Sequence, residues 1–123
     1  MTTILIIEDN LQNLYLMRFL LEQRGFSVLA AADGREGITV AGRLRPDCIL
    51  VDIQLPGLDG YAVAAALRAD PSLQAIPIIA VSSYPMVGDR EKALASGATD
   101  YVEKPIDPAI FVDQIRKHVP GRS

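Results

Sequence analysis

Five short apolar runs alternate with longer amphipathic stretches along this chain. Apolar runs of four to five residues between polar segments are typical of strands that are buried on both faces. We expect these strands at residues 3–8, 26–31, 47–52, 78–82 and 99–103. Because strands that alternate with helices form βαβ units, the pattern predicts an α/β fold built on a parallel sheet.

The amphipathic stretches predict five helices, at about 11–24, 35–45, 59–69, 85–96 and from 107 onward. Gly25 and Gly97 suit the left-handed conformation that often follows the end of a helix. Pro85 and Pro108 suit a first helical turn, where a missing N–H does least harm. Asp107 is of a type that caps helices, and we expect it to cap the last one.

Four of the strands end on or beside a residue with a chemically useful side chain. Glu8 and Asp9 follow the first strand, Asp52 ends the third, Ser82 ends the fourth and Lys104 follows the fifth. Parallel strands present their carboxyl ends at one edge of a sheet, where open α/β sheets bind ligands. We therefore expect three carboxylates, one hydroxyl and one ammonium at that edge.

Three carboxylates at one edge need compensation. Like charges about 4 Å apart repel by roughly 4 kcal/mol at an effective dielectric constant near 20. Either one carboxyl keeps its proton, which raises its pKa, or Mg²⁺ lies among the oxygens. Asp52 could be a metal ligand, or a nucleophile that attacks phosphorus to give an acyl phosphate. In the second case the cation and Lys104 would neutralise the phosphoryl oxygens, and Ser82 could donate a hydrogen bond to one of them.

Each of these residues also has an ordinary structural interpretation. Glu8 and Asp9 taken alone fit loop acids in solvent, Lys104 fits a solvated surface lysine, and Ser82 fits the end of a strand. Their occurrence together at one sheet edge favours phosphoryl chemistry, because an acidic cluster with an ammonium and a hydroxyl is suited to placing a phosphoryl group on an aspartate.

Length and composition exclude several other classes of protein. The chain has 123 residues, enough for one domain, and half of them are apolar, which excludes an extended disordered protein. No apolar run could cross a bilayer and no secretory signal is visible. Cys48 is the single cysteine, so no internal disulfide is expected and a cytoplasmic location fits. The net charge of −3 and the scattered basic residues argue against DNA binding. We expect residues 1–123 to form a single domain, with no output domain in this chain.

Four motifs give the chain a close resemblance to a known family. The stretches ILIIEDN, DIQLPGLDG, IIAVSS and YVEKPI occur in this order. They resemble the receiver domain of two-component response regulators, and the resemblance covers essentially the whole chain. It implies a flavodoxin-like (βα)5 three-layer sandwich with a parallel sheet in the order 2-1-3-4-5. It also implies a phosphoacceptor signalling module that catalyses only its own phosphorylation and dephosphorylation.

The resemblance implies roles for the acidic positions and their neighbours. Asp52 would accept the phosphoryl group, and Mg²⁺, or Mn²⁺ in its place, would bind Glu8, Asp9, Asp52 and the backbone carbonyl of Gln54. The donor would be a phosphohistidine on a histidine kinase or a histidine phosphotransfer protein. Gln54 and Tyr84 would influence the lifetime of the phosphoryl group, and Tyr84 would slow its hydrolysis by screening the attacking water.

A second group of positions would respond to the phosphoryl group. Ser82 matches the switch hydroxyl, followed by Ser83 where a small residue is usual, and Lys104 matches the phosphate-binding lysine, with a cis peptide bond to Pro105. We expect the ring of Tyr101 to enter from outside when Ser82 moves. The face of helix four, strand five and helix five would then change and bind a downstream target, in a protein that is monomeric or dimerises on phosphorylation. We expect four apolar residues on or near this face: Met86, Val87, Ile106 and Phe111.

The first expected helix carries more apolar residues than one buried stripe needs: Leu11, Leu14, Tyr15, Leu16, Met17, Phe19, Leu20 and Leu21. Two interpretations are open. The helix presents an exposed apolar patch that docks the histidine-bearing helices of a partner, or it is buried more fully than an average surface helix.

Four polar residues are expected to have structural roles alone. His118 would lie in the last turn of the last helix, where a cation suits the helix dipole. Cys48 would be a small core residue of the third strand. Asp100 and Glu103 would flank the fifth strand and face solvent.

Three other functions compete with phosphoacceptor signalling. An aspartyl-phosphate hydrolase usually has a second aspartate where Gln54 stands, and a flavin or nucleotide site would need a glycine-rich phosphate loop that this sequence lacks. A receiver-like module that binds partners without phosphorylation is the main alternative. The complete set of Asp9, Asp52, Ser82 and Lys104 argues against it.

Overall fold

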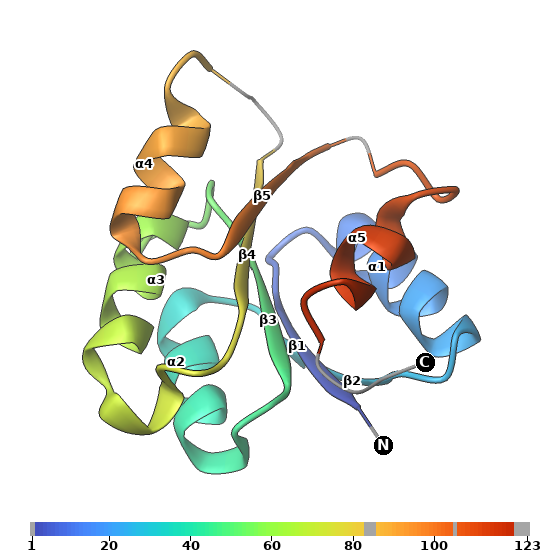
Figure 1. The fold of residues 1–123 in the computed structure, drawn as a ribbon, viewed down its shortest axis with the longest axis horizontal. Helices are drawn as coiled ribbons and strands as arrows, with labels where there is room; N and C mark the ends of the chain where they lie inside the picture. Colours follow the sequence, from blue (N-terminus) through green and yellow to red (C-terminus); the bar gives the residue numbers. More distant parts are fainter. Residues whose placement is uncertain (1, 83–85, 105, 120–123) are drawn as a thin grey trace.

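A five-stranded parallel sheet forms the centre of the molecule (Figure 1). Its strands are β1 (Thr3–Ile7), β2 (Ser27–Ala31), β3 (Cys48–Asp52), β4 (Ile78–Ser82) and β5 (Asp100–Glu103). They lie in the order β2-β1-β3-β4-β5, and every neighbouring pair is parallel. This confirms the predicted α/β class and flavodoxin-like strand order. The structure is a computed structural model that describes residues 2–82, 86–104 and 106–119.

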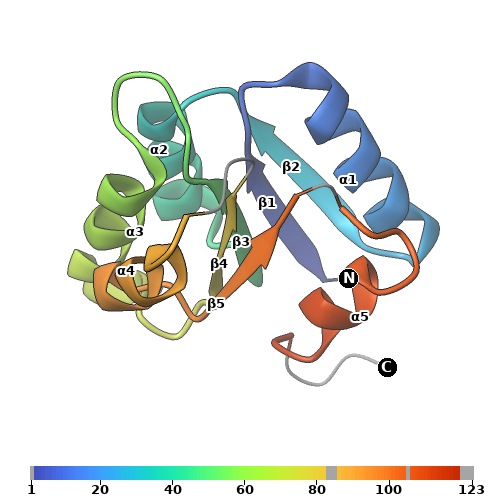
Figure 2. The same ribbon diagram turned by 90° about the horizontal axis from the view of Figure 1, so that it is seen from above.

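Helices cover both faces of the sheet and complete the three-layer sandwich (Figure 2). Helices α1 (Leu11–Gln23) and α5 (Phe111–Arg116) lie on one face. Helices α2 (Gly34–Leu44), α3 (Gly60–Ala69) and α4 (Asp89–Ser96) lie on the other, with a short 3-10 helix, η1 (Pro71–Leu73), after α3. No helix in the described part of the chain is long and apolar enough to span a membrane.

The apolar strands supply both layers of the core because successive side chains of a strand point to opposite faces. Leu5 and Ile7 of β1 belong to the core layer that also contains residues of α2, α3 and α4, whereas Ile4 and Ile6 belong to the layer that contains residues of α1 and α5. Strands β3 and β4 alternate in the same way, and Cys48 is a buried core residue as predicted. Each fully buried side chain of this size contributes about 1.5–3 kcal/mol.

Two helices begin later than the sequence predicts. Residues 86–88, which would continue a helix from Pro85, lie outside any helix, and α4 begins at Asp89 after Gly88. Helix α5 begins at Phe111, whereas Asp107 caps the turn before it by accepting the N–H of Ala109 at 2.9 Å. The expectations for Ser83, Tyr84, Pro85 and Pro105 themselves lie outside the described residues.

Helix α4 buries little of itself against the sheet. Of its eight residues only Ala93 is buried, and Gly88 at its N-cap has no side chain to bond the first turn. Tyr61 of α3 holds it from the side. The Tyr61 hydroxyl donates to Asp89 Oδ1 at 3.1 Å, and Lys92 Nζ lies 4.5 Å from the centre of the ring.

Asp100 and His118 are in hydrogen-bond contact, which corrects the expectation that Asp100 faces solvent. His118 lies two residues beyond the end of α5, and its Nε2 is 2.7 Å from Asp100 Oδ2. Arg90 of α4 contacts the other Asp100 oxygen at 3.3 Å. Burial alone would raise the pKa of Asp100, but the hydrogen bonds from His118 and from the Tyr101 N–H hold it below its ordinary value. These contacts tie β5 to the segments on both sides of it.

Arg68 fastens α3 to the amino-terminal ends of β4 and β5. Its Nε donates to the Gly97 carbonyl at 2.7 Å, and its Nη1 donates to the Ile76 carbonyl at 2.7 Å. Further hydrogen bonds reach the Leu73 carbonyl and the Thr99 hydroxyl. One guanidinium therefore satisfies acceptors in two segments, the one that leads into β4 and the one that leads into β5.

We predict that Arg68→Met lowers the free energy of unfolding by about 2–4 kcal/mol, because it leaves several partly buried carbonyls without donors. The matched control is Arg18→Met, which removes an exposed i,i+4 pair with Glu22 on α1 and changes stability by less than about 0.5 kcal/mol. Urea unfolding followed by circular dichroism measures both. Equal losses in the two variants would contradict the role assigned to Arg68.

Candidate functional site

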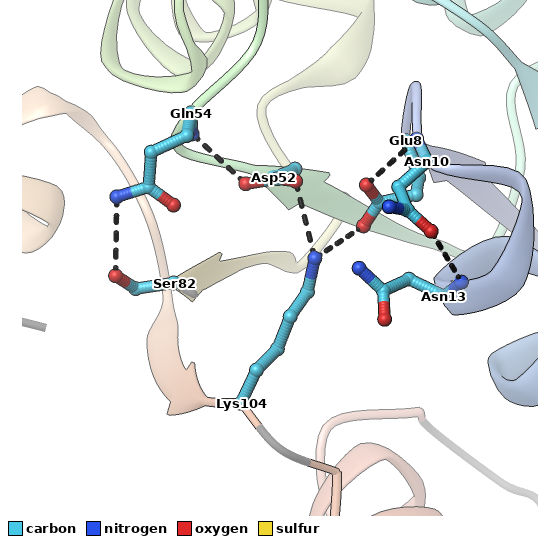
Figure 3. A network of polar contacts seen from close by, with 7 residues as sticks. All are labelled: Glu8, Asn10, Asn13, Asp52, Gln54, Ser82 and Lys104. Atoms are coloured by element: carbon cyan, nitrogen blue, oxygen red, sulfur yellow. Dashed lines mark hydrogen bonds and ion pairs between the residues drawn. The ribbon is translucent and has the colours of Figure 1, made fainter. Parts of the chain in front are cut away.

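Glu8, Asp52 and Lys104 meet at the carboxyl edge of the sheet (Figure 3). Lys104 Nζ lies 2.6 Å from Glu8 Oε1 and 3.1 Å from Asp52 Oδ2. The exposed fractions of the Lys104, Glu8 and Asp52 side chains are 6%, 1% and 5%. The predicted gathering of acids and ammonium is confirmed. Nothing in the sequence indicated that the ammonium would bridge Glu8 and Asp52.

Strand alternation decides on which side of the sheet each polar side chain lies. Asp52 lies two residues beyond Leu50 and so shares its face, which α1 and α5 cover. Ser82 lies two residues beyond Ala80 and shares the opposite face, where the ring of Tyr101 also packs. The edge therefore carries the charged groups on one side and the hydroxyl groups on the other.

The loop after β3 fixes the carboxylate of Asp52. Asp52 Oδ1 accepts the N–H of Gln54 at 2.8 Å. Gly60 then allows α3 to begin directly against the end of β3. A Cβ atom on Gly60 would lie 2.6 Å from the Cα of Ile53 and would clash with the carbonyl oxygen of Asp52. A side chain at this position would push α3 away from the site.

The acids after β1 lie beside the amino end of α1. Glu8 Oε2 accepts the N–H of Asn10 at 3.1 Å, and Asn10 caps the helix by accepting the N–H of Asn13 at 3.0 Å (Figure 3). Asp9, between them, is exposed. The amino end of a helix favours a nearby negative charge, because the unpaired N–H groups of the first turn and the positive end of the helix dipole lie there. The local structure thus partly offsets the repulsion among the acids.

Glu8, Asp9 and Asp52 are arranged so that they could hold a cation. One carboxylate oxygen from each lies within 4.8 Å of the others. A set of hard oxygen ligands open to solvent on the Asp9 side fits Mg²⁺, which keeps several waters and takes one or two carboxylates. The carbonyl of Gln54 as a further ligand stays a prediction.

Without a cation, the pocket holds a weakly acidic carboxyl group. Burial and the neighbouring Asp52 carboxylate raise the pKa of Glu8 to about 7, although Lys104 acts in the opposite direction. The sequence left two ways to relieve the repulsion among the acids, a retained proton or a bound cation. The raised pKa favours the first in the metal-free protein.

The hydroxyl side of the edge is buried. Ser82 is fully buried, and its Oγ accepts a hydrogen bond of 3.4 Å from Gln54 Nε2. Tyr101 is 8% exposed, and its hydroxyl has no hydrogen-bond partner of good geometry among the described residues. Burial raises the pKa of Tyr101, and the nearby Ser82 hydroxyl opposes that shift. The structure describes one conformation, in which the ring is already inside, so the movement of the ring when Ser82 moves stays a prediction.

A family model described as the response regulator receiver domain matches residues 4–116. The chain belongs to this family. The receiver domain is 38% identical over 117 residues to the polar-differentiation response regulator DivK of Brucella anthropi, and the match covers 95% of each chain. It is therefore a receiver domain of two-component signalling, and its acidic pocket fits Mg²⁺-dependent phosphorylation of an aspartate.

Solved structures agree with this assignment. A putative response regulator from Chloroflexus aurantiacus superposes with a TM-score of 0.92 at 27% identity, covering 96% of this chain and 97% of that chain. The receiver domain of a sensor histidine kinase from Pseudomonas aeruginosa superposes with a TM-score of 0.88 at 36% identity, again covering 96% and 97%. That structure holds a magnesium ion coordinated in its active-site cleft. Receiver domains are signalling modules rather than enzymes in the usual sense, so the hydrolase and the flavin or nucleotide alternatives lose their support.

We predict that Glu8→Gln changes how stability depends on pH in the presence of a chelator. The pKa of Glu8 in the folded protein, about 7, lies above its ordinary value of 4.5. The stabilisation that comes from the protonated carboxyl is therefore complete below about pH 4.5 and is lost as the pH rises through 7.

Between pH 5 and pH 8 the variant should therefore gain about 1–3 kcal/mol in unfolding free energy relative to the wild type. Urea titrations of both proteins at several pH values measure this difference. Parallel pH profiles for the two proteins would contradict the raised pKa.

Proposed function

We propose that this receiver domain takes a phosphoryl group onto Asp52 from a phosphohistidine donor, with Mg²⁺ held by Glu8, Asp9 and Asp52. The observation that carries the proposal is the buried contact between Lys104 and Asp52 beside a three-carboxylate group. An ammonium, a metal-binding set and an aspartate at one point supply what phosphoryl transfer to a carboxylate requires.

In this reaction an Asp52 carboxylate oxygen forms the new P–O bond while the P–N bond to the donor imidazole breaks. The backbone N–H of Gln54 holds Asp52 Oδ1 and so orients the carboxylate. Lys104 lies close enough to Asp52 to pair with the incoming phosphoryl oxygens. Mg²⁺, when bound, neutralises negative charge on those oxygens. Mn²⁺ has similar ligand preferences, and we propose that it substitutes.

Lys104 has to change partners during this cycle. Its ammonium now lies on Glu8 Oε1 at 2.6 Å, an oxygen of the proposed metal-binding set. A cation at this site would take over the charge of Glu8 and release Lys104 toward Asp52. The lysine thus stabilises the acidic pocket when it holds no metal, and it is available to the phosphoryl group when the pocket is filled.

We propose that the phosphohistidine donor docks on α1. Leu11, Tyr15 and Phe19 lie four residues apart and are 76%, 74% and 51% exposed, so they form one apolar stripe. A hollow of about 100 Å³ between Tyr15 and Phe19 is flanked by Arg18 and Glu22. This exposure disfavours the interpretation that α1 is merely more buried than usual. The stripe suits the helices of a histidine kinase or a histidine phosphotransfer protein.

We propose that a downstream target protein binds the face made by α4, β5 and α5. A groove of about 360 Å³ there is lined by Arg90, Tyr101, Val102, Glu103, Asp107, Ile110 and Gln114. Met86 and Val87 are highly exposed at the margin of this face. The prediction that Phe111 lies on this face is wrong, because its side chain is fully buried. Ile106 is also buried, with 8% of its surface exposed.

Several finer assignments stay predictions. They are the influence of Gln54 and Tyr84 on the phosphoryl lifetime, the accommodation of phosphate beside Ser83, and the cis bond between Lys104 and Pro105. A monomer that dimerises on phosphorylation, or that stays monomeric, likewise stays a prediction. All of these assignments depend on whether Asp52 is phosphorylated.

Incubation with Mg²⁺ and acetyl phosphate should give one phosphoryl adduct by intact-protein mass spectrometry. The adduct should be absent in Asp52→Asn, because the amide removes the nucleophilic carboxylate, and should persist in the control Asp113→Asn, an exposed residue of α5. No adduct on the wild type would favour the module that binds partners without phosphorylation. An unchanged adduct on Asp52→Asn would place the phosphoryl group elsewhere.

Lys104→Met should bind Mg²⁺ more tightly, by about 5- to 20-fold, because the ammonium no longer competes for the Glu8 and Asp52 oxygens. The same variant should be phosphorylated by acetyl phosphate at least about 10-fold more slowly, because charge on the phosphoryl oxygens loses a partner. Isothermal titration calorimetry and mass spectrometry measure the two effects. Weaker Mg²⁺ binding in the variant would exclude the exchange of partners proposed for Lys104.

A further inference from the structure

Gln54 contacts both halves of the site. Its backbone N–H donates to Asp52 Oδ1 at 2.8 Å, and its side-chain Nε2 donates to Ser82 Oγ at 3.4 Å (Figure 3). Asp52 and Ser82 belong to opposite faces of the sheet, so a residue of the loop beyond β3 is placed to bridge them. Gln54 itself is exposed at the rim, whereas Ser82 is fully buried.

The direction of the side-chain hydrogen bond matters for what Ser82 can do. A serine hydroxyl has one proton to donate and two lone pairs that accept. Because the Gln54 amide donates, it occupies a lone pair of Ser82 and leaves the hydroxyl proton for another acceptor. The backbone of Ser82 itself is held at the sheet edge, since its carbonyl accepts the N–H of Lys104 at 2.7 Å. The side-chain torsion of Ser82 is therefore the main freedom that Gln54 can restrict.

We propose that Gln54 is a positioning residue for phosphorylation, whose amide holds the Ser82 hydroxyl with its proton directed to a phosphoryl oxygen on Asp52. The proposal rests on phosphorylation of Asp52 and adds a role for the Gln54 side chain that acts through Ser82. It differs from a direct effect of Gln54 on the attacking water, because it requires the hydroxyl.

The geometry of the resting site fits this role. The 3.4 Å contact is longer than the roughly 2.7–3.2 Å that is usual for an N–H···O hydrogen bond, so it is weak in this conformation. Contacts of this kind in active sites tighten when the reacting group arrives. A phosphoryl oxygen that accepts the Ser82 proton makes Ser82 Oγ a better acceptor for the Gln54 amide, so the two hydrogen bonds strengthen each other.

A double-mutant cycle tests the proposal. The variants are Gln54→Met, which keeps the length of the side chain without a donor, Ser82→Ala, and the double variant. The first readout is the rate of phosphorylation by acetyl phosphate with Mg²⁺. The second is the affinity for Mg²⁺ in the presence of beryllium trifluoride, a mimic of the phosphoryl group. Binding of this mimic can be measured even in a variant that is phosphorylated slowly. We expect Gln54→Met to lower both by about five-fold when Ser82 is present, the effect of one hydrogen bond. It should change neither when residue 82 is alanine.

A matched variant tests the direction of the hydrogen bond. Gln54→Glu puts an acceptor where the amide donates, so it should compete for the Ser82 proton and reduce phosphorylation more than Gln54→Met does. The same change in the Ser82→Ala background measures the effect of the added charge alone. The loss caused by glutamate should therefore be larger with Ser82 than with alanine, after unfolding midpoints have shown that all variants remain folded.

Each other result overturns the proposal. An equal loss from Gln54→Met in both backgrounds means that Gln54 acts on the phosphoryl group or on water, not through Ser82. No loss in either background removes any role for its side chain. An unreactive wild type that also fails to bind the mimic ends the proposed function itself, whereas a reactive wild type with an uncoupled cycle ends only the role of Gln54.

Discussion

The ammonium of Lys104 lies between two buried carboxylates, and the rest of the site depends on that placement. Glu8 and Asp52 end neighbouring strands, so the sheet order brings them together whatever their charge. A buried charge without a partner costs several kcal/mol. Lys104 comes from β5, two strands beyond β3, and reaches over the end of β4. Ser82 leaves room for it, since the serine is small and belongs to the opposite face.

The sheet separates the site into a charged side and a hydroxyl side. The carboxylates of Glu8 and Asp52 and the ammonium of Lys104 belong to the face covered by α1 and α5, whereas Ser82 and Tyr101 belong to the face covered by α2, α3 and α4. A phosphoryl group on Asp52 would stand at the edge between the two. From this position a phosphoryl group could contact side chains on both faces of the sheet, although the two faces contribute to separate core clusters.

Sequence patterns predicted the parts of the molecule that local rules determine. Short runs rich in apolar residues located every strand, and the position of each polar residue at a strand end placed Glu8, Asp52 and Lys104 at one edge. The contacts that were missed join residues distant in the chain, such as Glu8 with Lys104 and Asp100 with His118. No local pattern records such pairs, because packing of whole elements brings them together.

Two features of the last part of the chain differ from what the sequence predicted or left open, for different reasons. Asp107 and Pro108 lie in a turn that precedes α5, because residues of these types favour turns as well as helix starts. The burial of the Tyr101 ring was not predicted, because it depends on helix α4, which covers that face of β5. Burial of an edge strand depends on the neighbouring helix and cannot be read from the strand.

The small buried surface of α4 has a consequence for how the molecule fluctuates. Local opening requires free energy in proportion to the contacts that are broken, and segments with few buried residues open most readily. With Ala93 as its one buried residue, α4 can detach from the sheet in excursions that leave the other helices in place. The proposed phosphoryl group on Asp52 would then change how often such excursions occur, rather than create a conformation that the protein never visits.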